Sequence, residues 1–197
     1  MRRSIVGVAV CALFTVDAAA QGANRVVPLH GTGQPLELRG TSHAGGSFDG
    51  VKFGGADLRR ANFRGASLVE AGLEFVVLDG ADFGSADLSY ATILPNSAKD
   101  ANFTRAILAH VTGNGANFDG AILGVSWAHG ANFTGASFVG AYLADADLRG
   151  ASLAYANLTN ANLTGANITD ASFVGAIWSN TICPDGTNSN ANPSCGL

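Results

Sequence analysis

The sequence predicts an all-β solenoid in which each side of a coil is five residues long. Three observations support this prediction: a strict five-residue period, a small residue two places before each large apolar one, and turn-forming residues in between. The stretch GASLAYANLTNANLTGANITDASFVGA, residues 150–176, shows all three. Alanine recurs there at every fifth position, and Leu, Ile or Phe follows two places later.

The large apolar position, here called the centre of each repeat, recurs through most of the 197-residue chain. Among the 27 centres from Phe48 to Trp178, nine are Phe, twelve are Leu, two are Ile and one is Trp. Ala fills 21 of the 25 positions that lie two places before the centres between 56 and 176. With 47% apolar and 13% charged residues, the chain is too apolar for disorder and can bury a core.

A period of five fits neither an amphipathic helix nor a simple alternating strand, whose periods are 3.6 and 2. In an extended segment, residues two apart point the same way, so the Ala and the centre of each repeat face inward. The residue between them, mostly Asn, Asp or Ser, faces outward. The next two residues, such as Thr-Gly or Arg-Gly, must turn the chain. Identical sides and corners then wind into coils that stack.

Several stretches resemble the pentapeptide repeat family, whose consensus is A-(N/D)-L-x-x. They are ADLRRANFRG (56–65), ANFTGASFVG (131–140) and ADLRGASLAYANLTNANLTG (146–165). The resemblance covers about three-quarters of the chain and implies a right-handed quadrilateral β-helix with four repeats per coil. The repeats from Leu36 to Asp185 would then make about seven coils.

Residues 1–20 are typical of a secretory signal peptide. A basic start, MRR, precedes the apolar run SIVGVAVCALFTV (4–16), and Ala18 and Ala20 fit a cleavage site after Ala20. One alternative is that this segment is a buried N-terminal helix or strand. Another is that Arg2-Arg3 marks a twin-arginine export signal. The mature chain would have a net charge of −5, which favours neither nucleic-acid binding nor membrane association. We therefore expect a periplasmic or secreted protein with no membrane insertion after cleavage.

The ends of the solenoid are expected to differ from its middle. The predicted domains are the signal peptide (1–20), an irregular leader and first coil (21–45), the β-helix (46–182) and a cap (183–197). Cys11 leaves with the signal peptide, so Cys183 and Cys195 form an even pair in an oxidising compartment and are predicted to be disulfide-bonded. Trp178, the bulkiest centre, is expected to cover the last coil.

The cap carries several side-chain oxygens that raise the alternative of a calcium site. They belong to Asp185, Asn188, Asn190 and Asn192. A single carboxylate and the lack of a terminal Glu differ from a calcium-binding loop, so a solvated capping loop is the preferred interpretation.

Two regions depart from the repeat. The centres Ala98, Gly113 and Ala128 are small, and we expect either a local narrowing or filling of the space by Phe118 and Phe133. Residues 93–100 keep the five-residue frame but lose the consensus. Pro95 cannot donate a ladder hydrogen bond, which predicts a bulged corner there.

No motif for catalysis, phosphate binding or dinucleotide binding is present in the sequence. We predict no enzyme activity, no catalytic residue, no cofactor and no metal. His110 and His129 are separated by almost one full coil of sequence and would meet near one corner of neighbouring coils. A two-histidine metal pair is the alternative there to ordinary surface histidines.

Outward positions that should be polar are apolar in one region, which predicts an interaction surface. The residues are Ile107, Ile122, Val125, Trp127 and Tyr142. With four repeats per coil, Ile107 lies directly below Trp127, Ile122 lies directly below Tyr142, and Val125 lies at the corner between them. Exposed apolar patches with Trp and Tyr are typical of protein interfaces. The alternative is scattered substitution on a stable rod, with Trp127 covering the gap at Ala128.

These features favour a non-enzymatic exported protein that acts as a rigid binding or structural scaffold. Its expected partner is another protein, with a second copy of the chain as one candidate. The family resemblance also implies an alternative, a DNA-mimicking rod that shields type II topoisomerases from quinolones. That role needs a cytoplasmic address and a strongly acidic face, whereas Arg59, Arg60 and Arg64 lie together and the acidic residues are spread out.

Overall fold

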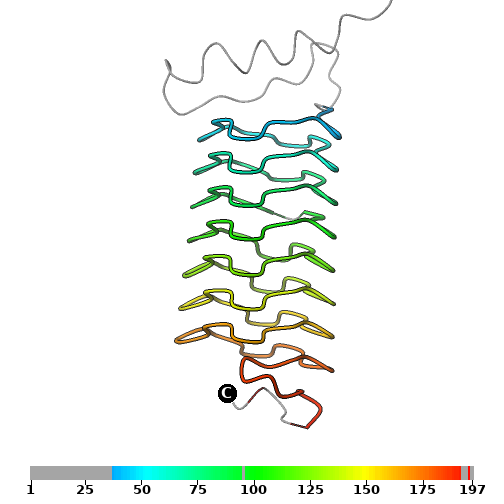
Figure 1. Ribbon diagram of the computed structural model, residues 1–197, viewed down its shortest axis with the longest axis vertical. Coiled ribbons are helices and arrows are strands. Elements are labelled where there is room, and N and C mark those ends of the chain that lie inside the picture. The colour runs from blue at the N-terminus through cyan, green and yellow to red at the C-terminus, as the bar shows by residue number, and fades with distance from the viewer. Residues whose placement is uncertain (1–36, 95, 192–194, 196–197) are drawn as a thin grey trace, which may run out of the picture.

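A computed structural model describes residues 37–94, 96–191 and 195 of the chain. The described residues wind around one axis as a stack of coils, with residues 37 onward at the top of Figure 1 and the C-terminal residues at the bottom. Within these ranges there is no α-helix, and the extended segments are single β-bridges rather than longer strands. No described segment is a helix long and apolar enough to cross a membrane.

The coils are held in one register along the whole stack. Every bridge from Glu37–Asp57 to Asn162–Ile182 is parallel and joins residues twenty positions apart. Bridged residues recur every five positions, and each is the outward residue directly before a centre. Four repeats therefore make one coil, as predicted, and equivalent residues of successive coils form straight columns.

Most corners are tight turns closed by a backbone hydrogen bond. In the repeat of residues 61–65, the amide of Ala66 donates to the carbonyl of Phe63 at 3.0 Å, and Gly65 has a φ of 62°. The described fifth residues of the repeats from Gly40 to Asn180 adopt a positive φ of this kind, which favours glycine. Other residues also occupy this position, including Arg60 and Phe75, both with a φ of 58°.

The outward Asn or Asp of many repeats satisfies one backbone amide of the turn. In residues 101–105, four amides donate to backbone carbonyls, whereas the amide of Thr104 donates to Oδ1 of Asn102 at 3.0 Å. The Thr104 hydroxyl donates to the same oxygen at 2.6 Å. The same arrangement recurs at Asn132, Asn157, Asn162 and Asn167. These side chains act as local caps, which explains their frequency at this position.

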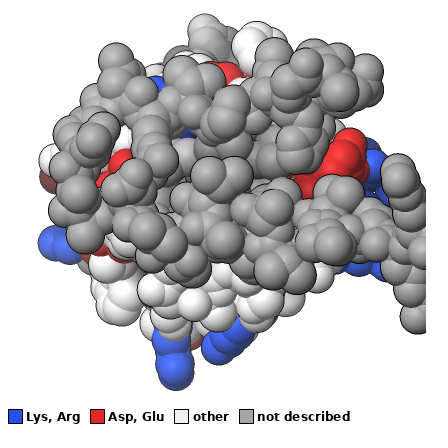
Figure 2. All heavy atoms as spheres, turned by 90° about the horizontal axis from the view of Figure 1, so that it is seen from above, with Lys and Arg blue, Asp and Glu red and all other residues white. Residues whose placement is uncertain are grey.

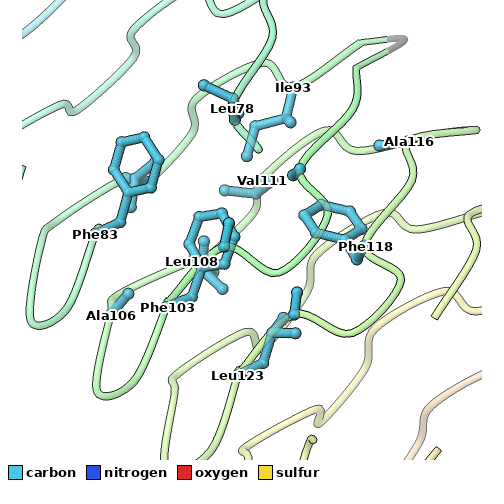
Figure 3. Close-up of a cluster of buried hydrophobic side chains, with 14 of the residues drawn as sticks. Leu78, Phe83, Ile93, Phe103, Ala106, Leu108, Val111, Ala116, Phe118 and Leu123 are labelled. Atoms are coloured by element: carbon cyan, nitrogen blue, oxygen red, sulfur yellow. The ribbon is translucent and has the colours of Figure 1, made fainter. Parts of the chain in front are cut away.

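The centres and the preceding alanines fill the axis of the stack. Phe63, Phe83 and Phe103 form one column, with ring centroids 5.3 and 5.2 Å apart and rings within 6° of parallel. Phe83, Phe103 and Phe118 point into the shared core with leucines of neighbouring columns (Figure 3). Seen along the axis, the charged side chains in view lie around the rim (Figure 2).

The space beside the small centre Gly113 is occupied by aromatic rings. A Cβ built at Gly113 would lie 2.9 Å from Cδ1 of Phe133 and 3.6 Å from Cε2 of Phe118. Phe118 also packs edge-to-face on Phe133, with ring centroids 5.5 Å apart. The expectation that Phe118 and Phe133 compensate for a small centre is confirmed at this position.

Asn96 replaces the usual alanine and closes a turn of the preceding coil. Its buried side chain accepts a hydrogen bond from the amide of Val76 at 2.9 Å and donates to the carbonyl of Leu73. In an ordinary corner, the amide at the position of Val76 donates directly to the carbonyl at the position of Leu73. Pro95, where a bulged corner was predicted, lies outside the described residues, but the bridges at Ser97 keep the register.

Residues 37–45, which were expected to be irregular, carry the same bridges and turns as the rest of the stack. His43 therefore occupies a centre position, which the sequence analysis did not foresee. Its ring stacks on Phe63 at a centroid distance of 5.0 Å, and Nε2 lies 2.7 Å from the Thr41 hydroxyl. Burial lowers the pKa of His43 below its ordinary value.

The chain reverses after the last coil and covers one of its edges. Ile182 bridges Asn162 in parallel and Asn188 in antiparallel fashion, so residues 182–188 form a hairpin on the edge of the stack. The buried Thr181 hydroxyl donates to the carbonyl of Leu158 at 2.7 Å. The sulfur atoms of Cys183 and Cys195 lie 2.08 Å apart, which places Cys195 beside the hairpin. Trp178 is only partly buried and packs on Phe173.

Candidate interaction surface

The predicted apolar residues gather around one corner of the stack. Val125 is a turn residue with a φ of 57°, and its column contains Arg105 in the coil before and Asp145 in the coil after. Backbone hydrogen bonds hold these corners together, since the Arg105 amide donates to Gly124 and the Val125 amide donates to Ala144. We call the five predicted residues the Val125 corner surface (Ile107, Ile122, Val125, Trp127 and Tyr142).

The structure brings all five residues together as the spacing predicts. Ile122 and Tyr142 are bridged on the side before the corner, and Ile107 and Trp127 are bridged on the side after it. Four of the five are substantially exposed: Ile122 by 42%, Val125 by 44%, Trp127 by 46% and Tyr142 by 46%. Outward positions of neighbouring coils are mostly Asn, Asp or Ser, so this apolar area is local.

The ring of Tyr142 lies across the corner rather than away from the rod. A Cβ built at Gly124 would be 2.8 Å from Cε1 and 3.1 Å from Cδ1 of Tyr142. The missing side chain of Gly124 thereby leaves room for the ring beside the turn. The sequence spacing places Tyr142 on its side of the coil, but it does not reveal that the ring lies beside the turn residue Gly124.

Two exposed charged residues flank Val125 in its own column. Arg105 and Asp145 are both exposed, and neither side chain has a hydrogen bond or ion pair within the described residues. The Asp145 carboxylate lies against Gly165 of the next coil, since a Cβ there would approach its Oδ1 and Cγ. The surface is therefore an apolar centre with one cation below and one anion above.

The neighbouring charged pair on the Trp127 side is already satisfied. Asp147 follows Trp127 in the same column and accepts two hydrogen bonds from the Arg149 guanidinium, at 2.8 and 2.6 Å. The hydrogen bonds from Arg149 lower the pKa of Asp147. The apolar surface is therefore bordered on this side by a carboxylate whose charge is compensated by Arg149.

The next corner holds the histidines that were considered as a metal pair. The His110 ring stacks on Tyr90 at 5.0 Å and contacts His129 edge-on at 5.6 Å between centroids. Across the described residues, no group of three or more His, Cys, Asp or Glu side chains is arranged to hold a metal ion. The geometry is that of an aromatic stack, and Nδ1 of His129 is buried there without a hydrogen-bond partner.

The oxygens of the capping loop are engaged within the loop itself. Oδ1 of Asp185 accepts hydrogen bonds from the amide and hydroxyl of Thr187, at 2.9 and 2.7 Å. Oδ1 of Asn188 accepts from the Asn190 amide, and Oδ1 of Asn190 accepts from the Asn180 amide. These contacts fit the capping-loop interpretation. Asn192 lies outside the described residues.

A second exposed apolar group lies nearer the C-terminal end. Tyr155 is 67% exposed, and its ring lies over Gly175, close to the exposed Val174. Ile177 is also exposed, on the side that follows this corner. The predicted interaction surface did not include Tyr155, Val174 or Ile177.

The repeat itself matches a known family. The family model described as pentapeptide repeats matches eight copies, over residues 47–84, 99–124, 129–165 and 141–180. The chain belongs to the pentapeptide repeat family. Family membership confirms the right-handed quadrilateral β-helix as the fold class, in agreement with the four bridged sides of each coil.

Solved structures of pentapeptide repeat proteins are similar to this chain. One is HetL, involved in heterocyst differentiation regulation in the cyanobacterium Nostoc sp. strain PCC 7120, with 30% identity, 78% of this chain and 77% of that chain covered, and a TM-score of 0.33. Another is full-length QnrB1, a plasmid-mediated fluoroquinolone resistance protein, with 16% identity, 72% and 90% covered, and a TM-score of 0.44. A third is Rfr23 from the cyanobacterium Cyanothece 51142, with 22% identity, 72% and 90% covered, and a TM-score of 0.28.

A search of curated proteins finds no match to this chain.

Proposed function

We propose that this pentapeptide repeat protein is an exported, non-enzymatic scaffold of about seven coils that binds a protein partner through the Val125 corner surface. The gathering of five apolar residues at one corner of a rod whose outward positions are mostly Asn, Asp or Ser carries the proposal. Trp and Tyr supply large contact areas at little cost in side-chain entropy, which suits them as anchors of a protein interface.

The construction of the rod supports a binding role over a chemical one. The centres and the preceding alanines fill the axis, and the outward Asn and Asp side chains largely cap turns of their own coil. Enzyme sites usually combine a concave pocket with convergent polar groups. The Val125 corner surface is instead a convex apolar area, which favours contact with another macromolecule.

Export is the part of the proposal that residues 1–20 support, and a direct experiment tests it. Cells expressing the full-length chain with a C-terminal tag would be fractionated, and the mature N-terminus would be read by mass spectrometry. We expect the protein outside the cytoplasm, beginning at Gln21, with Cys183 and Cys195 oxidised. A cytoplasmic protein that retains residues 1–20 would overturn export and make a topoisomerase-protection assay the next measurement.

Binding through the corner can be tested with paired substitutions. Trp127→Ala combined with Tyr142→Ala removes the two largest exposed rings and leaves the buried centres unchanged. A matched control is Tyr155→Ala, which removes an exposed ring from another corner. We expect the double variant to lose self-association and to recover no partner after cross-linking. The wild-type protein and Tyr155→Ala should retain both. Equal partner recovery from all three proteins would contradict the proposed surface.

A further inference from the structure

The column through Val125 has a charge arrangement that matches a second copy of the same chain. Arg105 lies one coil before Val125, and Asp145 lies one coil after it, so opposite charges stand at equal sequence distance from an apolar midpoint. Coils spaced ~4.8 Å apart place the two charged residues ~10 Å from each other along the rod. Both side chains are exposed and have no ion pair with a described residue.

We propose that two copies of the chain pair side by side and antiparallel through the Val125 corner surface. A two-fold axis perpendicular to the rod, at the height of Val125, places Arg105 of each copy opposite Asp145 of the other. Two symmetric ion pairs then flank an apolar centre in which Val125 meets its own equivalent. This inference rests on the proposed binding surface and names its partner.

A parallel pairing through the same corner is disfavoured by the same charges. It would place Arg105 opposite its own equivalent and Asp145 opposite its own equivalent, with no compensation from this column. Like charges held together at an interface repel strongly, so the charge pattern selects the antiparallel arrangement. Asp147 does not disturb it, because its carboxylate is already bound by Arg149.

The apolar part of the surface fits contact between two rods. The Tyr142 ring lies beside the turn at Gly124, which directs apolar area toward the corner rather than toward the middle of a side. Trp127 and Ile122 lie at the same height as Val125, in the same coil on either side of the corner. The proposed contact uses five apolar and two charged residues of each copy, fewer than a standard specific interface, so dimerisation should depend on concentration.

Charge exchange provides a direct test. Arg105→Asp and Asp145→Arg should each weaken dimerisation about tenfold or more, since each creates two like-charge contacts across the two-fold axis. The double variant Arg105→Asp with Asp145→Arg should restore it. A mixture of the two single variants should form heterodimers, because each substituted residue then faces a residue of opposite charge on the other copy. Corner positions of this β-helix already accept Asp and Arg, so all variants should fold.

The measurements are sedimentation equilibrium over a wide concentration range, native mass spectrometry of the mixture, and small-angle X-ray scattering. Arg60→Asp is the matched control, because Arg60 is an exposed corner residue with the same positive φ and lies outside the surface. We expect scattering to show a dimer whose longest dimension is close to that of the monomer. Arg60→Asp should leave the dimerisation constant unchanged.

Three results would overturn the inference: a monomer at every concentration, a dimer insensitive to Arg105→Asp, or a scattering profile of end-to-end rods. If the wild-type protein is monomeric but Trp127→Ala with Tyr142→Ala abolishes capture of another protein, the second copy is wrong and the proposed binding surface stands. If the dimer responds to charge exchange but the protein remains cytoplasmic, dimerisation stands and export is wrong.

Discussion

The ring of Phe133 occupies the space that a side chain at Gly113 would need. Cδ1 of Phe133 lies 2.9 Å from the position of a Cβ at Gly113, and Cε1 lies 3.1 Å from it. Phe133 belongs to the next coil of the same column, and it also packs edge-to-face on Phe138 at 5.3 Å. The small centre Gly113 is therefore compensated by large neighbouring centres. The residue tolerated at one centre depends on the centre in the next coil.

Restoring the family consensus at this position should destabilise the protein. Gly113→Leu should lower the free energy of unfolding by about 1–3 kcal/mol or more, because the rings of Phe133 and Phe118 must move to admit it. Urea denaturation followed by circular dichroism measures the change. Leu153→Met, a volume-conserving change in the same column, is the control and should cost less. An increase in stability for Gly113→Leu would contradict the packing described here.

The Phe63–Phe83–Phe103 column predicts a graded response to truncation. Phe103→Ala should cost about 3–5 kcal/mol, since it opens a cavity inside the axis and removes a stacked ring. Phe103→Leu should cost clearly less, because Leu123 already continues the same column one coil later. Equal losses for the two variants in thermal or urea unfolding would show that ring stacking and cavity size do not determine stability here.

His43 predicts a dependence of stability on pH near neutrality. Burial lowers its pKa, so the folded protein favours the neutral ring more strongly than the unfolded chain does. The stability that this group contributes is complete above its unfolded pKa and is lost as the pH falls through that value toward the folded pKa.

The corresponding measurement compares Tm for the wild-type protein and His43→Leu between pH 8 and pH 5. The wild-type Tm should fall more steeply below about pH 6.5 than the variant Tm does. His110 and His129 are present in both proteins, so their contributions cancel in the difference. A difference in Tm that stays constant with pH would exclude His43 as its source.

Two corner positions with a positive φ test the preference for glycine there. Introducing glycine at one should stabilise the protein, and removing glycine from the other should destabilise it. Phe75→Gly should stabilise the protein by up to about 1 kcal/mol, because Phe75 is 71% exposed and holds a φ of 58° that glycine adopts more easily. Gly65→Ala should destabilise by a similar amount, although nothing lies within 4 Å of the added Cβ. Thermal unfolding of both variants tests this, and the same sign for both would contradict it.

The C-terminal hairpin predicts a stabilising role for the Cys183–Cys195 pair. Replacing both cysteines by serine should lower the free energy of unfolding by about 3 kcal/mol, the loop-closure value expected for a bond that spans 12 residues. Unfolding of the oxidised wild-type protein with and without reductant gives the same comparison without mutation. If reductant leaves the unfolding curve unchanged, the two cysteines do not form a stabilising bond.

The sequence was sufficient to predict the inward and outward positions, the corners and the membership of the Val125 corner surface. These follow from a period shared by all repeats, so an error in one repeat is corrected by its neighbours. The insertion of Asn96 between Val76 and Leu73 was not predicted, because it depends on a contact between successive coils. The centre position of His43, stacked on Phe63, was missed because a polar residue at a centre looks like the end of the repeat.

Because all parallel bridges share one register, the length of the rod can change without changing the direction in which each residue faces. Deleting twenty consecutive residues removes one whole coil, and every remaining column stays continuous because each residue keeps its side. Deleting five residues shortens the chain by one side and turns everything downstream by a quarter of a revolution. A five-residue loss between Arg105 and Asp145 would leave both residues exposed but pointing in perpendicular directions. In such a molecule, natural or engineered changes of length fall into two classes, those that preserve the pattern of every face and those that reassign it.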